Sequence, residues 1–476
     1  MTTTASPAWT LSPDRCFDPE PTQRRLAHEL YAGVEALPLV CPHGHVAPSL
    51  LADSAARFPS PAELLIVPDH YIFRMLYSQG VRLEDLGVPT RDGTPVETDG
   101  RAIWRRFAER FSVFAGTPTG LWLKSELIEL FGVHHKPSAE SADRVYDQLE
   151  RRLHEPDFTP RALFRRFNIE LFSTTDAATD GLDHHRALRA EGWTQVRPTL
   201  RPDGVVNLDA PGWRQNIDRL SEVSRLSVVD YSSFVRALEQ RRQVFKELGA
   251  FATDHSAVTA RTQRLSPAEA GAIFERSLRG APEDGDAERF TAHMLVEQAR
   301  MATEDGLVMQ LHIGSYRNHN PVIWERFGLD MGADIPVATD WTRGLQPLLA
   351  AYGNDPRLRL VLFTLDETTY GRELAPLAGH YPAVFLGPPW WFYDSVSGME
   401  RYLDAVVETA GVYNLAGFND DTRAFASIPA RHQVWRRVIS NWLAGKVVRG
   451  MMDEDDAPAL AAELAYTCPK RAYRLA

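Results

Sequence analysis

The sequence predicts an α/β fold of the (β/α)8 TIM-barrel class, a single domain over residues 1–476 with a mainly helical insertion over residues 56–167 after the first strand. Short apolar runs recur along the chain, and most are followed by polar residues and then by a stretch with helical periodicity. Length alone does not decide between one large barrel and two or three ordinary domains. The alternation of strands and helices favours the barrel.

Eight apolar runs are the predicted strands, and eight strands alternating with helices favour a closed barrel over an open doubly wound sheet. The fourth run is the weakest, because it is short and its side chains are small. In chain order the predicted strands are 39–41, 169–173, 195–199, 249–253, 307–311, 359–365, 383–386 and 413–418.

The predicted insertion between the first two strands is rich in helix signals. Residues 60–63 read Ser-Pro-Ala-Glu, a capping box with proline at the first helical position. Aromatic residues also recur there at helical spacing, and we expect them to face a core: Trp104, Phe107, Phe111 and Phe114.

The composition and charge exclude some classes of binding partner. A net charge of −11 excludes a nucleic acid held by bulk electrostatics, so an anionic substrate requires a local group of arginines. The three cysteines are widely spaced and form no CxxC motif, which indicates neither a disulfide framework nor a thiolate zinc site. With no signal peptide and no apolar run of about 20 residues, we expect a cytoplasmic protein without a membrane partner.

A metal site is predicted at the end of the first strand. His43 and His45 are two residues apart, so in an extended segment both imidazoles point to the same side. Together with Asp421, after the last strand, they form a donor set that suits zinc or a similar divalent ion. A surface turn with two histidines, and a helix-capping role for Asp421, are the alternatives.

Arginines follow three of the predicted strands, at the end of a barrel where active sites lie. Arg201, Arg317 and Arg423 suit a substrate carboxylate, because a guanidinium group binds it through two parallel hydrogen bonds; solvated surface arginines are the alternative. His312 follows the fifth strand, and Tyr71 lies in the insertion. Each is a candidate acid or base, or else a core residue.

These motifs, in this order, make the chain resemble the uronate isomerases, a branch of the amidohydrolase-like metal-dependent barrels. The resemblance covers nearly the whole chain. Its markers are Pro42-His43-Gly44-His45, Asp69-His70-Tyr71, Ser173-Thr174-Thr175-Asp176, Arg201-Pro202-Asp203, Asp254-His255, Gln310-Leu311-His312-Ile313-Gly314 with Arg317-Asn318, Gly387 with Trp390-Trp391-Phe392, and Asp421-Thr422-Arg423-Ala424-Phe425. The chain departs from the usual family pattern after Asp176 and after Asp421, which bears on substrate preference.

The resemblance implies interconversion of D-glucuronate with D-fructuronate and of D-galacturonate with D-tagaturonate, a small-molecule hexuronate being the partner. It implies that His43, His45 and Asp421 hold the metal. It further implies that the sugar acid is surrounded by Tyr71, Arg201, Asp254, His312, Arg317, Trp390, Trp391 and Arg423.

The resulting hypothesis is an aldose–ketose isomerase that works through an enediolate, with zinc as the expected metal. Asp421, Tyr71 and His312 are the acid/base candidates, and the sequence does not choose among them. Two rivals remain: a mononuclear metal-dependent hydrolase of a sugar-acid lactone or amide on the same barrel, and a sugar-acid-binding barrel without activity. The size of the predicted barrel is also compatible with a homo-oligomer.

Overall fold

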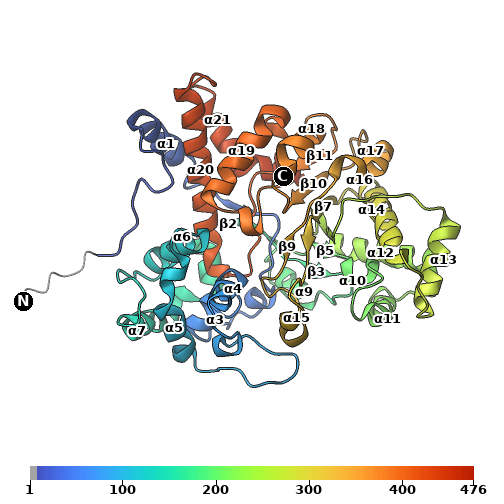
Figure 1. Ribbon diagram of the computed structural model, residues 1–476, viewed down its shortest axis with the longest axis horizontal. Helices are drawn as coiled ribbons and strands as arrows, with labels where there is room; N and C mark the ends of the chain where they lie inside the picture. Colours follow the sequence, from blue (N-terminus) through green and yellow to red (C-terminus); the bar gives the residue numbers. More distant parts are fainter. Residues whose placement is uncertain (1–7, 476) are drawn as a thin grey trace, which may run out of the picture.

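The computed structural model describes residues 8–475 and contains a ring of parallel strands surrounded by helices (Figure 1). The parallel strands are β1 (Leu39–Cys41), β2 (Ile169–Ser173), β3 (Asp176–Ala177), β4 (Val196–Arg197), β5 (Leu200–Arg201), β6 (Ala252–Ala257), β7 (Val308–Ile313), β10 (Leu360–Thr364) and β11 (Val384–Leu386).

The strands pair in the order in which they follow one another along the chain. β1 pairs with β2, and β2 pairs with β4. β3 and β5 continue these last two segments and pair with each other; β5 then pairs with β6, β6 with β7, β7 with β10, and β10 with β11. Every one of these pairings is parallel, as a (β/α)8 barrel requires.

The ring is completed by the segment that follows β11. Leu415 forms a single parallel bridge to Leu386, and the Ala416 amide donates to the Leu386 carbonyl at 2.8 Å. On the other side the His45 amide donates to the Thr422 carbonyl at 3.0 Å, which joins the last segment to the first. The predicted fold class, a (β/α)8 barrel, is thereby confirmed.

The first two predicted strands have the bounds found in the structure, and among the others the fourth and the eighth differ most. The fourth was expected over 249–253, but β6 begins at Ala252 and runs to Ala257, so Asp254 and His255 lie within it. The prediction placed this strand too early because it relied on an apolar run. The second half of β6 is polar and faces the mouth of the barrel. The eighth was expected over 413–418, but residues 412–414 form a 3-10 helix.

Helices alone occupy the described segment between β1 and β2. They are α2 (Ser49–Ala52), α3 (Pro61–Leu65), α4 (His70–Ser78), α5 (Gly100–Glu109), α6 (Pro118–Ser125), α7 (Ala142–Leu153) and α8 (Pro160–Arg166). Ser60 caps α3 by accepting the Glu63 amide at 3.2 Å, as the sequence predicts. Helices α3–α7, blue to cyan in Figure 1, lie together on one side of the strands.

The remaining helices surround the rest of the ring. They are α1 (Pro21–Val34), α9 (Asp183–Ala190), α10 (Asp203–Val206), α11 (Trp213–Ser224), α12 (Tyr231–Glu247), α13 (Pro267–Leu278), α14 (Asp286–Asp305), α15 (Pro321–Phe327), α16 (Trp341–Gly344), α17 (Gln346–Tyr352), α18 (Ala375–Ala378), α19 (Val396–Ala410), α20 (Ile428–Val448), α21 (Ala457–Ala462) and α22 (Cys468–Ala472). Two short strands, β8 (Ser315–Tyr316) and β9 (Ile335–Pro336), form an antiparallel pair after β7. None of the helices within residues 8–475 combines the length and apolar character needed to cross a bilayer.

Candidate active site

A cavity at the carboxyl ends of the strands brings together all the residues that the sequence analysis selected. Its walls come from the segments after β1 and β11, from β5, β6 and β7, and from α4. The lining residues are His43, His45, His70, Tyr71, Arg201, Asp254, His312, Arg317, Asp330, Gly332, Asp334, Trp390, Trp391, Asp421 and Arg423. The position of this cavity matches the end of a (β/α)8 barrel where active sites are built.

Two imidazoles and a carboxylate converge on one point of this cavity. Asp421 Oδ1 lies 3.4 Å from His43 Nε2 and 3.2 Å from His45 Nε2. Asp421 has a φ of +41°, a strained conformation for a residue with a side chain, and such strain is characteristic of functional positions. The backbone therefore directs this carboxylate at the two histidines.

The charges of this group fit a divalent cation. Burial would raise the pKa of Asp421, but His43 and His45 outweigh it and hold the pKa well below its ordinary value. Burial lowers the pKa of His45 to about 4, so its imidazole is neutral and can act as a ligand at neutral pH. The Nδ1 atom of His43 is buried without a hydrogen-bond partner in the described structure. Burial opposes the charged form of His43, but Asp421 and Asp254 raise its pKa above the ordinary value, so a metal ion would displace a proton there. Two imidazoles and an ionised carboxylate are a common donor set for zinc.

His312 lies directly behind this group. Its ring stacks on His43 at a centroid distance of 4.7 Å and on Phe363 at 4.2 Å. Its Nδ1 atom donates to Asp254 Oδ1 at 2.6 Å, and the other oxygen of Asp254 lies 3.3 Å from Arg201. With the proton on Nδ1, the Nε2 atom carries a free lone pair, and it is buried without a partner among the described residues.

Each of the three predicted arginines is held by a carboxylate and is partly exposed to the cavity. These contacts fix the guanidinium groups, and their other N–H groups remain available to a ligand. The shortest ion pairs are Arg201 with Asp203 at 2.8 Å, Arg317 with Asp334 at 2.8 Å, and Arg423 with Asp330 at 2.7 Å.

Tyr71 reaches the cavity from α4 and is anchored at its hydroxyl. The hydroxyl donates to Asp394 at 2.8 Å, and Arg431 donates to the same carboxylate oxygen at 3.0 Å. The Arg431 guanidinium also lies over the rings of Trp122, at 3.7 Å, and Tyr71, at 4.5 Å. Burial and the charge of Asp394 hold the pKa of Tyr71 well above its ordinary value, so its phenol keeps its proton.

Two tryptophans form an aromatic wall of the cavity. The ring of Trp390 meets the edge of His312 at 5.0 Å. The ring of Trp391 stacks on His70 at 4.3 Å, and its indole N–H donates to the Asp334 carbonyl at 3.0 Å. This wall offers an apolar face beside the charged groups.

Four lining residues were not selected from the sequence. His70 precedes Tyr71 in a marker motif of the resemblance, and that motif was the signal that could have found it. Asp330, Gly332 and Asp334 lie between α15 and β9, in a segment that follows no predicted barrel strand. The β8–β9 pair carries this segment back over the cavity, which the apolar pattern does not show.

Comparisons with known proteins agree with this architecture. The family model described as glucuronate isomerase matches residues 22–473. A uronate isomerase of Nostoc punctiforme is 62% identical over 465 residues, which cover 98% of each chain. The crystal structure of glucuronate isomerase from Caulobacter crescentus superimposes with a TM-score of 0.96 at 48% identity and covers 98% of each chain.

A more distant solved structure gives the same result. The uronate isomerase from Thermotoga maritima has a TM-score of 0.90 at 28% identity and covers 98% of this chain and 99% of that one. The resemblance found in the sequence motifs is therefore confirmed over the full length of the match. The chain belongs to the glucuronate isomerase family.

Proposed function

We propose that this chain is a uronate isomerase that interconverts D-glucuronate with D-fructuronate and D-galacturonate with D-tagaturonate. Membership of the glucuronate isomerase family supports the reaction class. The observation that carries the proposal is a single cavity that combines three arginines, a set of metal-type donors and three acid/base candidates. These components supply substrate recognition, charge stabilisation and proton transfer for an aldose–ketose isomerase acting on a sugar acid.

The arginines supply recognition of the substrate carboxylate. A guanidinium group holds a carboxylate through two parallel hydrogen bonds, and Arg201, Arg317 and Arg423 are already fixed by acidic neighbours. Trp390 and Trp391 contribute apolar surface to the cavity wall, which suits the C–H groups of a sugar. The positive charge of the three arginines thus favours an acidic sugar over a neutral one.

His43, His45 and Asp421 are the residues that would hold a divalent metal ion, and we propose zinc because two imidazoles and one carboxylate suit it. When bound, such an ion polarises substrate oxygen atoms and stabilises negative charge that develops on them. Asp254 and Arg201 lie beside the group and hold His312 in one orientation.

The proton transfers are assigned to groups of this cavity. One base removes the proton from C2 to give an enediolate, and an acid returns a proton to C1. His312 Nε2 has a free lone pair and suits the role of acceptor. Tyr71 keeps its phenolic proton and suits the role of donor. Asp421 is the third candidate, through its second carboxylate oxygen.

Proton NMR in deuterated water tests the reaction with D-glucuronate and D-galacturonate as parallel samples. The expected result is the ketose with deuterium at C1, because an enediolate exchanges its proton with solvent. Ketose without deuterium would retain the isomerase and replace the enediolate by a hydride shift or a shielded proton. No ketose from either sugar, with zinc supplied, would refute the proposal and direct attention to lactones and amides.

We also propose the cytoplasm as the place of action and a homo-oligomer as the working form. The three cysteines are free in the structure, which is typical of proteins in a reducing compartment. Light scattering of the purified protein measures the oligomeric state directly.

A further inference from the structure

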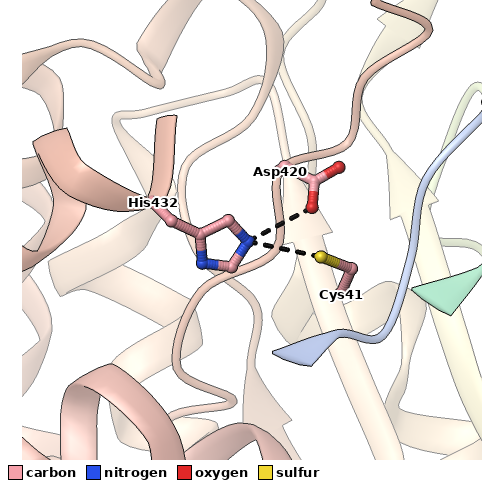
Figure 2. Close-up of side chains that lie close together, drawn as sticks. All are labelled: Cys41, Asp420 and His432. Atoms are coloured by element: carbon pink, nitrogen blue, oxygen red, sulfur yellow. Dashed lines mark hydrogen bonds and ion pairs between the residues drawn. The ribbon is translucent and has the colours of Figure 1, made fainter. Parts of the chain in front are cut away.

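A second group of metal-type donors lies close behind the first. Cys41 is the last residue of β1, Asp420 immediately precedes Asp421, and His432 lies in α20. All three are buried, with exposed fractions of 1%, 2% and 3%. Figure 2 shows that the imidazole of His432 faces both the sulfur and the carboxylate.

The distances in this group match the edges of a coordination tetrahedron. His432 Nε2 lies 3.5 Å from Cys41 Sγ and 3.2 Å from Asp420 Oδ2, and the three donor atoms lie within 4.8 Å of one another. In tetrahedral zinc sites, Zn–S bonds of about 2.3 Å and Zn–N or Zn–O bonds of about 2.0 Å place S and N about 3.5 Å apart and N and O about 3.3 Å apart.

A hydrogen-bonded histidine–carboxylate pair is usually closer than this one. Charge-assisted N–H···O bonds are typically about 2.7–2.9 Å long, and the separation here is 3.2 Å. The His312–Asp254 pair of the neighbouring site, at 2.6 Å, shows a direct contact of this kind. The separation of His432 and Asp420 is at the long end of the hydrogen-bond range and equals the spacing of two ligands of one tetrahedral ion.

The balance of charge points the same way. A metal ion binds the thiolate form of cysteine, and a thiolate beside a carboxylate gives two negative charges that one divalent cation neutralises. The nearby Arg436 does not supply the charge by direct contact, because its guanidinium donates to the carbonyls of Glu35 and Pro38, at 2.9 Å and 2.8 Å.

His432 borders a cavity of about 310 Å³ that is lined by residues of α1, α20 and the end of α6. This cavity shares no lining residue with the candidate active site. The two donor groups also have no common ligand.

We propose that Cys41, Asp420 and His432 form a second, structural metal site that binds a zinc-type divalent ion. Binding releases the thiol proton to solvent and leaves one tetrahedral position for a further ligand. The bound ion joins the first strand, the segment after the last strand and helix α20. It also fixes the backbone next to His43 and Asp421, two ligands of the candidate active-site metal.

Cobalt(II) loading tests this site, since a cobalt–thiolate bond produces a charge-transfer absorption that imidazole and carboxylate ligands do not. The wild-type protein is expected to bind two equivalents of cobalt per chain and to show this absorption. Cys41→Ser is expected to lose the absorption and one equivalent. Cys16→Ser and Cys468→Ser are matched controls that should keep both, because neither cysteine belongs to the group.

A variant of the other site separates the two metals. His45→Ala is expected to lose one equivalent and to keep the thiolate absorption. A wild-type protein without the absorption, or a Cys41→Ser variant that retains it, would overturn the proposal. Should Cys41→Ser fail to fold, X-ray absorption of the zinc-loaded wild type decides: a sulfur neighbour at about 2.3 Å supports the site, and a shell of nitrogen and oxygen alone refutes it.

Discussion

Glu126 carries a buried carboxyl group whose replacement should stabilise the protein in a pH-dependent way. It lies at the end of α6, borders the cavity that reaches His432 and is 4% exposed. Burial first, and then the charge of Asp69, raise the pKa of Glu126 to about 8, with Arg431 opposing them. The ordinary pKa of a glutamate in an unfolded chain is about 4.3. The folded state therefore keeps a proton that the unfolded state releases.

The sign of the effect follows from this difference. Between about pH 4.5 and pH 8 the folded state binds more protons, so the free energy of unfolding falls as the pH rises. One pKa unit corresponds to about 1.4 kcal/mol, so the carboxyl costs about 3 kcal/mol at pH 7 and about 1 kcal/mol at pH 5. Glu126→Gln does not titrate and should recover these amounts. They are upper bounds, because water in the adjoining cavity solvates the ionised form.

Urea unfolding of the wild type and Glu126→Gln at pH 5, 6, 7 and 8 measures the effect. The advantage of the variant is expected to grow with pH across this range. Glu129→Gln is the matched control: Glu129 borders the same cavity but forms a partly exposed ion pair with Arg15 at 3.2 Å, so its loss should change stability by at most about 1 kcal/mol. A difference between wild type and Glu126→Gln that is the same at pH 5 and pH 8 would refute the reasoning.

Three further changes test the groups around the candidate active site. Tyr71→Phe removes the hydroxyl that donates to Asp394 and should lower kcat by about 10²–10⁴-fold if Tyr71 transfers a proton; a loss below about tenfold in steady-state assays excludes that role. Arg431→Met leaves the buried Asp394 without its cation and should cost about 3–5 kcal/mol in urea unfolding, with partial recovery when Asp394→Asn is added. Arg201→Lys should raise KM for the uronate, as measured by initial rates, because an ammonium group cannot bind a carboxylate bidentately; an unchanged KM places the substrate carboxylate elsewhere.

The apolar pattern predicts most of the barrel because a parallel strand is buried on both faces and therefore appears as a continuous apolar run. The apolar pattern fails for strands that contribute polar residues to the candidate active site. β6 continues through Asp254 and His255, and a polar run of this kind is not recognised as a strand. The segment after β11 forms only one bridge, at Leu415, so its apolar residues pack without a regular ladder.

The site residues that directly follow a barrel strand could be predicted from the sequence. The carboxyl ends of parallel strands lie on one face of the barrel, so the residues after them come together. Asp330 and Asp334 could not be predicted in this way, because they follow no barrel strand. They lie in the long connection after β7, and the β8–β9 pair places them at the cavity. The group of Cys41, Asp420 and His432 was not predicted from the sequence either. Cys41 lies far along the chain from Asp420 and His432, so no spacing of cysteines and histidines in the chain predicts their meeting.

The hydrogen bond between the His45 amide and the Thr422 carbonyl has a consequence for folding kinetics. It joins residues that are separated by about four-fifths of the chain, and contacts of such sequence separation form slowly because a very long loop must close. His43 and His45 meet Asp421 only when this contact exists. During refolding, catalytic activity is therefore expected to return after helical circular dichroism has recovered, and its recovery reports the closing of the barrel.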